Sequence, residues 1–178
     1  MSGEKSAPEF SRIFDRRGLP GAAVMLEAQA EERDALAERF ALVSIKSLMA
    51  EMTFEPVGEN IRVKGMLEAE IVQSCAVSGD DLPVRISEPL SLVFVPASDL
   101  QSLPEEVELE EHELDEIAYE GTSFDLGEAI AQSLALAIDP FATGPDADIA
   151  RRNAGLLDEE LSGPLAAGLA ALKGLRTD

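Results

Sequence analysis

The sequence is poor in the residues on which metal-binding and disulfide-stabilised proteins depend. It has one cysteine, Cys75, and one histidine, His112. A single cysteine excludes an internal disulfide framework, and these two residues cannot supply the four ligands of a structural zinc site. A nucleophilic cysteine needs a nearby base, but the histidine lies in a run of glutamates. We therefore interpret Cys75 as structural or inert, and we expect no metal, no cofactor and no small-molecule substrate.

Long apolar runs and basic residues are also scarce. The longest nearly uncharged run, around Ala129–Ile138, is far shorter than the roughly 20 residues that cross a bilayer. The N-terminus carries charge from Glu4 onward and does not look like a secretory signal, so we expect a cytoplasmic protein without membrane contact. The 35 acidic and 14 basic side chains give a formal charge of −21. Such a field repels phosphate backbones and argues against non-specific nucleic-acid binding, although a local basic face remains open.

Alternating apolar residues, which are abundant, predict several strands. The predicted strands are Val24–Ala30, Val43–Val57, Ile61–Val72 and Leu82–Val95. The second is interrupted near Ser47–Met49, where a bulge would explain the change of face. The last three should form an antiparallel meander, which Val24–Ala30 can join. The sequence thus predicts an α+β fold with an antiparallel sheet of about four strands and two to three helices.

Helical spacing appears in separate segments. Glu31–Leu42 predicts a short amphipathic helix, and Asp125–Ile138 predicts a longer one that Asp125 and Glu128 can cap and Pro140 ends. Leu165–Leu175 can form a short helix weakened by glycines. We predict the organisation 1–22 as an N-terminal arm packing around Phe10, Ile13 and Phe14, 23–141 as the α+β domain, and 142–178 as a loose tail.

An acidic linker, residues 99–120, interrupts this domain. It contains ten acidic residues and no lysine or arginine. Such a block repels itself, so a solvated linker that is more mobile than the sheet is expected. An acidic docking surface for a basic partner is the alternative.

The candidate contact residues are three basic side chains on the predicted strands. Arg62 and Lys64 share one face by the period-two rule, and Arg85 points outward from the neighbouring strand. Together they predict a small basic patch for RNA or another partner, which Arg12, Arg16 and Arg17 would extend if the arm folds nearby. Solubility and protection of a sheet edge is the alternative role. The sequence has no glycine-rich phosphate loop, nucleophile elbow or histidine cluster, which favours binding over catalysis.

Two long segments resemble known signatures. EAEIVQSCAVSGDDLPVRISEPLSLVFVP resembles the central signature of the YceD-like family, bacterial proteins linked to accumulation of large-subunit ribosomal RNA. DEIAYEGTSFDLGEAIAQSLALAIDPF is similar to the family's second signature, and GPLAAGLAALKGL to its leucine-rich end. Many members carry C-x-x-C at the position of Cys75, whereas Ser78 replaces the second cysteine here. A metal role therefore does not carry over from the resemblance.

The resemblance implies a non-enzymatic factor that supports large-subunit ribosomal RNA accumulation or ribosome biogenesis. Its partner would be a large-subunit ribosomal protein or ribosomal RNA. A generic acidic protein-interaction module without a ribosomal link is an alternative. A ribosomal RNA processing enzyme is another, although metal-dependent hydrolysis needs carboxylates gathered in a cleft, and the acids here cluster in one linker.

Overall fold

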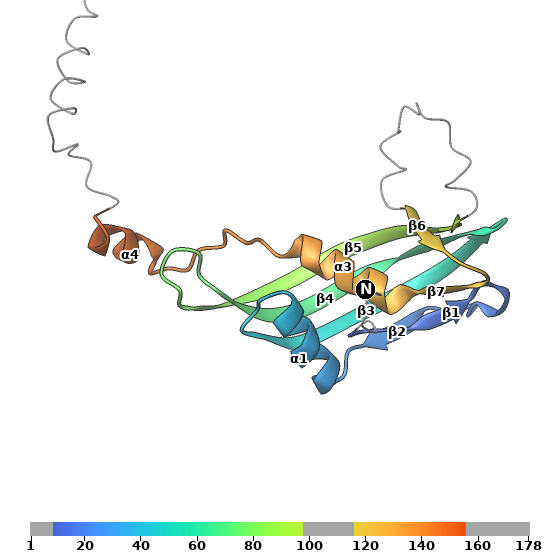
Figure 1. The fold of residues 1–178 in the computed structure, drawn as a ribbon, viewed down its shortest axis with the longest axis horizontal. Coiled ribbons are helices and arrows are strands. Elements are labelled where there is room, and N and C mark those ends of the chain that lie inside the picture. The colour runs from blue at the N-terminus through green and yellow to red at the C-terminus, as the bar shows by residue number, and fades with distance from the viewer. Residues whose placement is uncertain (1–8, 98–115, 156–178) are drawn as a thin grey trace, which may run out of the picture. The chain divides into compact units, whose positions relative to one another are not determined.

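The computed structural model describes residues 9–97 and 116–155. The chain divides into two compact units, one of Met1–Ser74 with Asp81–Pro140 and the other of Cys75–Asp80 with Phe141–Asp178. The larger unit holds both sheets and helices α1 and α3 (Figure 1). The predicted boundaries of arm, domain and tail stay predictions.

A five-stranded sheet dominates the larger unit, in the order β2-β3-β4-β5-β6. Its strands are β2 (Val24–Glu27), β3 (Ser44–Val57), β4 (Asn60–Ser74), β5 (Asp81–Pro96) and β6 (Glu116–Tyr119). The first four pair antiparallel, but β6 runs parallel to β5 over Val93–Pro96. The α+β class and the antiparallel pairing of the four predicted strands are confirmed, but a fifth strand, β6, makes the sheet mixed and not purely antiparallel. The predicted acidic linker is long enough to return the chain for parallel pairing, and its last residues form β6 instead of remaining solvated.

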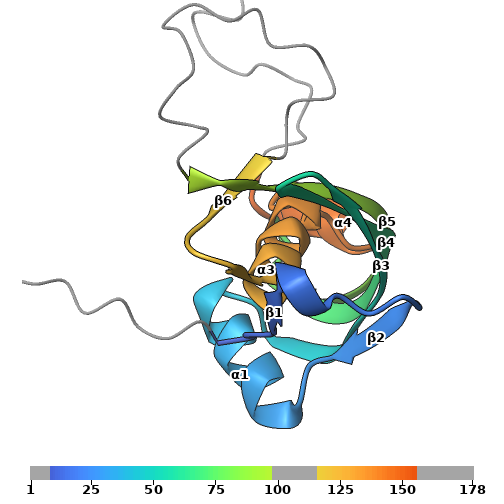
Figure 2. The ribbon, with the colours of Figure 1, turned by 90° about the vertical axis from the view of Figure 1, so that its right-hand side faces the viewer.

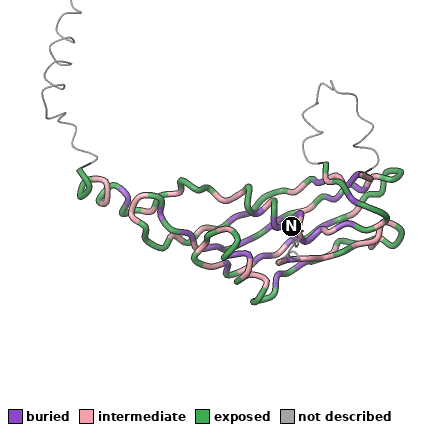
Figure 3. The backbone as a smooth tube through the Cα atoms, in the orientation of Figure 1, coloured by how far each residue is buried: buried purple, intermediate pink, exposed green. Residues whose placement is uncertain are grey.

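The central strands follow the predicted alternation closely. On β4, inward-facing residues and exposed residues alternate along most of the strand (Figure 3). The pairing of β3 with β4 shifts register between Ile45 and Ser47, which confirms the predicted bulge. Gly65 permits the close approach of these strands, because a Cβ there would collide with the backbone oxygen of Glu51.

The N-terminal segment is folded into the larger unit. Strand β1 (Ile13–Asp15) pairs antiparallel with β7 (Ser123–Asp125) to form a separate two-stranded sheet, and a short 3₁₀ turn (Arg16–Gly18) follows. Phe10 is fully buried in the core, whereas Ile13 is 63% exposed. The arm therefore packs as expected through Phe10, while Ile13 lies at the surface.

The described residues of this unit include the helices α1 (Ala30–Arg39) and α3 (Leu126–Ala137). Glu32 accepts a hydrogen bond from the amide of Gln29 at 2.7 Å, so an acid of the first turn does cap α1. Asp125 caps α3 by accepting from the amide of Glu128 at 3.1 Å. Helix α3 lies within the curve of the sheet (Figure 2), and its apolar stripe joins the core made by β3, β4 and β5.

The smaller unit contains helix α4 (Ala147–Asn153) and the turn Cys75–Asp80. The predicted loose tail, residues 142–178, therefore includes a helix near its start. The predicted helix Leu165–Leu175 and most of the acidic linker lie outside the described residues. No helix within residues 9–97 and 116–155 has the length and hydrophobicity to cross a membrane.

Candidate binding surface

The outer face of the five-stranded sheet, which points away from α3, carries all three predicted contact residues. The inner face is sealed by the core, whereas the outer face is largely exposed. Arg62 and Lys64 are both exposed and lie two residues apart on β4. Arg62 lies opposite Glu55 of β3 and Val93 of β5, so these two cations adjoin one acidic side chain.

The third predicted residue lies far from the other two. Arg85 pairs in the β4–β5 register with Glu70 and forms an ion pair with its carboxylate at 2.8 Å. Glu70 is six residues beyond Lys64 on β4, which corresponds to about 20 Å along a strand. The three basic residues therefore share a face, as alternation predicted, but they do not assemble into one patch.

The arm does not extend a basic patch either. Its arginines are each engaged with an acid, with nitrogen-to-oxygen distances between 2.6 and 3.0 Å. The pairs are Arg12–Glu32, Arg16–Glu59 and Arg17–Asp15. Hydrogen bonding to Arg12 lowers the pKa of Glu32, so this pair stays charged at neutral pH.

Between the two separated basic positions lies a different surface. The β2–β3–β4 register sets Met25, Glu51 and Met66 side by side in one row. The next row contains Glu27, Met49 and Glu68. We call these six residues the methionine–glutamate surface. Met25 is 60% exposed and Met66 41%, and all three glutamates are exposed.

The glutamates of this surface have no counter-ion among the residues that the structure describes. Within residues 9–97 and 116–155, no ion pair or hydrogen bond engages the carboxylates of Glu27, Glu51 and Glu68. A hollow of about 220 Å³ adjoins the surface, lined in part by Met49, Glu68 and the Glu70–Arg85 pair. Sequence reasoning missed this surface because its residues come from three strands. Which of them lie side by side depends on the register between the strands, and alternation within one strand does not predict that register. Alternation did place each methionine and its flanking glutamates outward, and that was the available signal.

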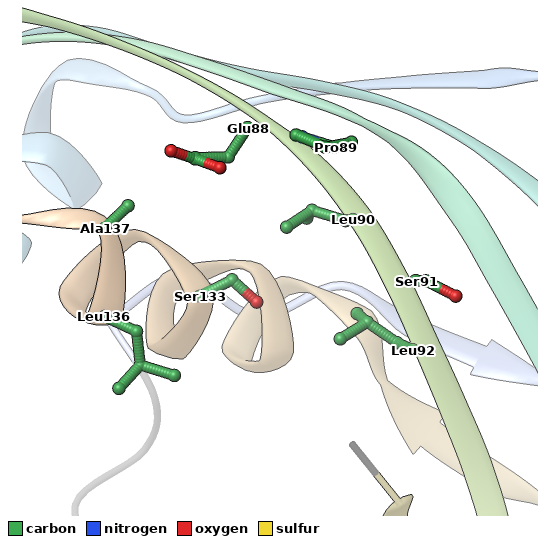
Figure 4. A pocket seen from close by; sticks show the side chains of 8 residues that line it. All are labelled: Glu88, Pro89, Leu90, Ser91, Leu92, Ser133, Leu136 and Ala137. Atoms are coloured by element: carbon green, nitrogen blue, oxygen red, sulfur yellow. The ribbon is translucent and has the colours of Figure 1, made fainter. Parts of the chain in front are cut away.

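The cavities in the larger unit carry no paired catalytic groups in the residues described. A cleft of about 290 Å³ separates β5 from α3 (Figure 4). Its only charged lining residue is Glu88, and the hydroxyl of Ser133 donates to the backbone oxygen of Ala129. A wider cavity of about 630 Å³ has an aromatic floor of Phe94 and Phe124. Glu120, Asp125, Glu128 and Ser123 also line this cavity, and within the described residues no hydrogen bond joins the Ser123 hydroxyl to these carboxylates.

Cys75 lies in the smaller unit and is 4% exposed. Its sulfur accepts hydrogen bonds from the amides of Gly144 at 3.3 Å and Ser78 at 3.4 Å. These bonds, with that of Gly144 the strongest, lower the pKa of the thiol to about 6. Cys75 thus joins its own turn to the segment that precedes α4. The described residues contain no group of three or more histidine, cysteine, aspartate or glutamate side chains that could hold a metal ion.

The fold and this surface together define an α+β protein with an exposed, glutamate-rich sheet face. Its sequence matches the family described as Large ribosomal RNA subunit accumulation protein YceD over residues 63–173. The match spans more than half of the 178 residues, and the chain belongs to this family, as the sequence resemblance predicted. No curated protein and no solved structure matches this chain.

The aspartate-leucine-glycine-glutamate motif of the second signature has a structural role here. Asp125 accepts hydrogen bonds from the amide of Arg12 at 2.8 Å and the hydroxyl of Ser11 at 2.6 Å. A Cβ on Gly127 would lie 2.7 Å from the carbonyl oxygen of Phe10, so only glycine lets the arm pack this closely. Glu128 pairs with Arg39 of α1 at 2.9 Å, which lowers its pKa. Through these contacts the motif holds the arm and α1 against α3.

Proposed function

We propose that this protein is a non-enzymatic factor that supports accumulation of large-subunit ribosomal RNA by binding a basic protein of the large subunit. The observation that carries the proposal is the outer sheet face, where exposed glutamates occupy the centre and the predicted basic patch is divided. An acidic partner shields a basic protein until that protein meets RNA. Complementary charge also accelerates association of the acidic protein with its basic partner at low salt. Such a role would place the protein in the cytoplasm.

Direct RNA contact is the second candidate, favoured by the exposure and proximity of Arg62 and Lys64. Each phosphate that a protein neutralises steepens the salt dependence of binding by about 0.9 log units on duplex and about 0.7 on single strands. Two neighbouring cations therefore give a shallow slope and weak affinity. The surrounding negative field weakens this contact further.

An absence of catalytic activity is part of the proposal. It is supported by these two cavities of the larger unit, whose described lining includes no histidine, cysteine or lysine and no hydrogen bond from a lining serine hydroxyl to a lining carboxylate. The opposing hypothesis is a nuclease that trims ribosomal RNA precursors. Incubating the protein with precursor RNA in the presence and absence of magnesium tests this directly, and magnesium-dependent cleavage would contradict the proposal.

Two titrations test the proposed partner, one with basic large-subunit proteins and one with a ribosomal RNA fragment, each across a salt series. We expect tighter binding to at least one basic protein than to RNA. The variant R62E/K64E/R85E should abolish any RNA signal and retain protein binding. The control K46E/R151E/R152E makes the same change in net charge at other positions and should affect RNA binding less.

Two results would overturn the proposal. One is the absence of measurable binding to any basic large-subunit protein at low salt. The other is tight RNA binding that persists in R62E/K64E/R85E. Mass spectrometry of proteins that co-purify with the full chain identifies the partner and separates a ribosomal factor from a generic acidic module.

A further inference from the structure

We propose that the methionine–glutamate surface binds a basic amphipathic helix of the partner protein, an inference that rests on the proposed function. The surface is an alternating array in which each residue's neighbour on the adjacent strand is of the other type. Met25 and Met66 flank Glu51 in one row, and Glu27 and Glu68 flank Met49 in the next. Directly paired side chains in such rows lie about 5 Å apart.

The methionines supply the apolar contact. The three methionines are diagonal neighbours on one sheet face, with Met49 of β3 diagonal to both Met25 and Met66. Diagonal positions lie about 7–8 Å apart, within reach of long side chains, so the three form a group, unlike the single exposed apolar residues that any surface carries. Met25 and Met66 leave 60% and 41% of their area in water. Methionine is unbranched and polarisable, so it adapts its rotamer to differently shaped apolar side chains. A methionine group of this kind suits a partner whose apolar ridge is aliphatic.

The glutamates determine the charge of that partner. Every methionine has a glutamate beside it, and the three carboxylates have no counter-ion within the described ranges. A helix that lays an aliphatic ridge on the methionines would bring its flanking lysine or arginine side chains to these carboxylates. A second copy of this chain is a poor occupant, because the formal charge of −21 makes two copies repel each other.

The strand pairing favours a helix over an extended peptide. At these positions the backbone of β3 is paired on one side with β2 and on the other with β4, so the face offers side chains only. A helix satisfies its own backbone hydrogen bonds and can bind such a face through side chains. The distance from β2 across β3 to β4 is about 10 Å, close to the diameter of one helix.

The probe for this surface is a fluorescently labelled 18-residue leucine–lysine peptide with leucine at helical spacing. A scrambled peptide of the same composition lacks the apolar ridge. Anisotropy titrations of the full chain should show at least tenfold tighter binding of the helical peptide. Two triple variants separate the contributions of charge and apolar contact, E27Q/E51Q/E68Q and M25Q/M49Q/M66Q. Each should weaken binding about tenfold or more.

Matched controls change similar side chains elsewhere. E31Q/D34N/E38Q removes three exposed acids from α1, and I13Q/L136Q removes two exposed apolar side chains, one of them 86% exposed. Both controls should change affinity less than twofold. Thermal melts of all variants verify folding, which is expected to persist because the altered side chains are exposed, apart from the half-buried Met49.

The inference is overturned if both triple variants bind the helical peptide as the unaltered chain does, or if the scrambled peptide binds equally well. It also fails if the full chain binds a basic ribosomal protein and neither triple variant weakens that complex. That last result would leave the proposed function standing with its site elsewhere. Conversely, peptide binding that depends on this surface, with no ribosomal protein bound, would support the surface and refute the proposed partner.

Discussion

The two faces of the five-stranded sheet differ in what determines their residues. On the inner face of β4, Ile61, Val63, Leu67 and Ile71 are all at most 1% exposed, and their identity is set by packing against α3 and the neighbouring strands. On the outer face of the same strand, basic, acidic and thioether side chains follow one another in water. The inner pattern is what any such fold requires, whereas the outer pattern is not needed for the fold. The outer face is therefore the informative one for function.

The sharpest test of this contrast compares neighbours on β4. Leu67→Ala should lower the free energy of unfolding by about 2–5 kcal/mol, because it removes a fully buried side chain and leaves a cavity. Met66→Ala, on the opposite face, should cost about 0.5 kcal/mol or less. Urea denaturation of both variants provides the measurement. Equal losses would mean that Met66 belongs to the core.

A second test concerns the close approach of β3 and β4. Gly65→Ala should destabilise the protein by about 1–3 kcal/mol or more, since the added methyl group meets the backbone of Glu51 and the sulfur of Met52. Gly21→Ala is the control, because a Cβ there has no neighbour within 4 Å among the described residues. Thermal unfolding of the pair should show a clear drop in Tm for Gly65→Ala alone.

A smaller effect is expected at Asp125, which binds both α3 and the N-terminal arm at the inner face of the sheet. Asp125→Ala removes the cap of α3 and the acceptor for the arm, at a cost of about 1–2 kcal/mol. Asp125→Asn keeps one carbonyl oxygen as an acceptor and should lose less. Chemical denaturation distinguishes the two. An asparagine variant as unstable as the alanine variant would show that charge, and not the cap, is what matters.

The smallest effect should appear with pH. The pKa of Glu32 lies below its ordinary value of 4.5 because of its hydrogen bond to Arg12. Its contribution to stability is therefore complete above about pH 4.5 and is lost as the pH falls through the lowered pKa. Glu32→Gln should cost about 0.5–1 kcal/mol near neutral pH, and this difference should shrink in acid. A pH series of melts, with Glu31→Gln as control, would contradict this if the difference stayed constant.

Much of the larger unit could be predicted from the sequence because its strands, bulge and helix cap depend on residues that are close together in the chain. Alternation predicted the long strands β3, β4 and β5, and the broken pattern near Ser47–Met49 predicted the bulge. The strand predicted over Val24–Ala30 is shorter, since β2 ends at Glu27 and Ala30 begins α1. The cap at Asp125 was visible in the spacing of two acids. These features depend on residues a few positions apart, where backbone geometry alone decides the outcome.

The misses involve relations between distant residues. Alternation tells which face a side chain occupies, but not how far along the strand it lies. Arg85 is therefore on the predicted face yet opposite Glu70, a position that follows only from counting through the turn at Cys75–Asp80. The parallel pairing of β6 depends on which residues after the acidic linker lie beside β5, and no pattern of neighbouring residues predicts that. Helix α4 is short and rich in alanine and charge, so it lacked a visible apolar stripe.

The joining of β1 to β7 has a consequence for synthesis of the chain. The amide of Arg12 and the carboxylate of Asp125 that binds it are 113 positions apart. Because synthesis runs from the N-terminal side, Arg12 must wait for 113 further residues before its partner exists. Contacts this distant in sequence carry a high loop-closure cost and form late. During translation β3, β4 and β5 can pair as hairpins while residues 9–15 remain undocked, and this part of the unit is completed only when α3 emerges.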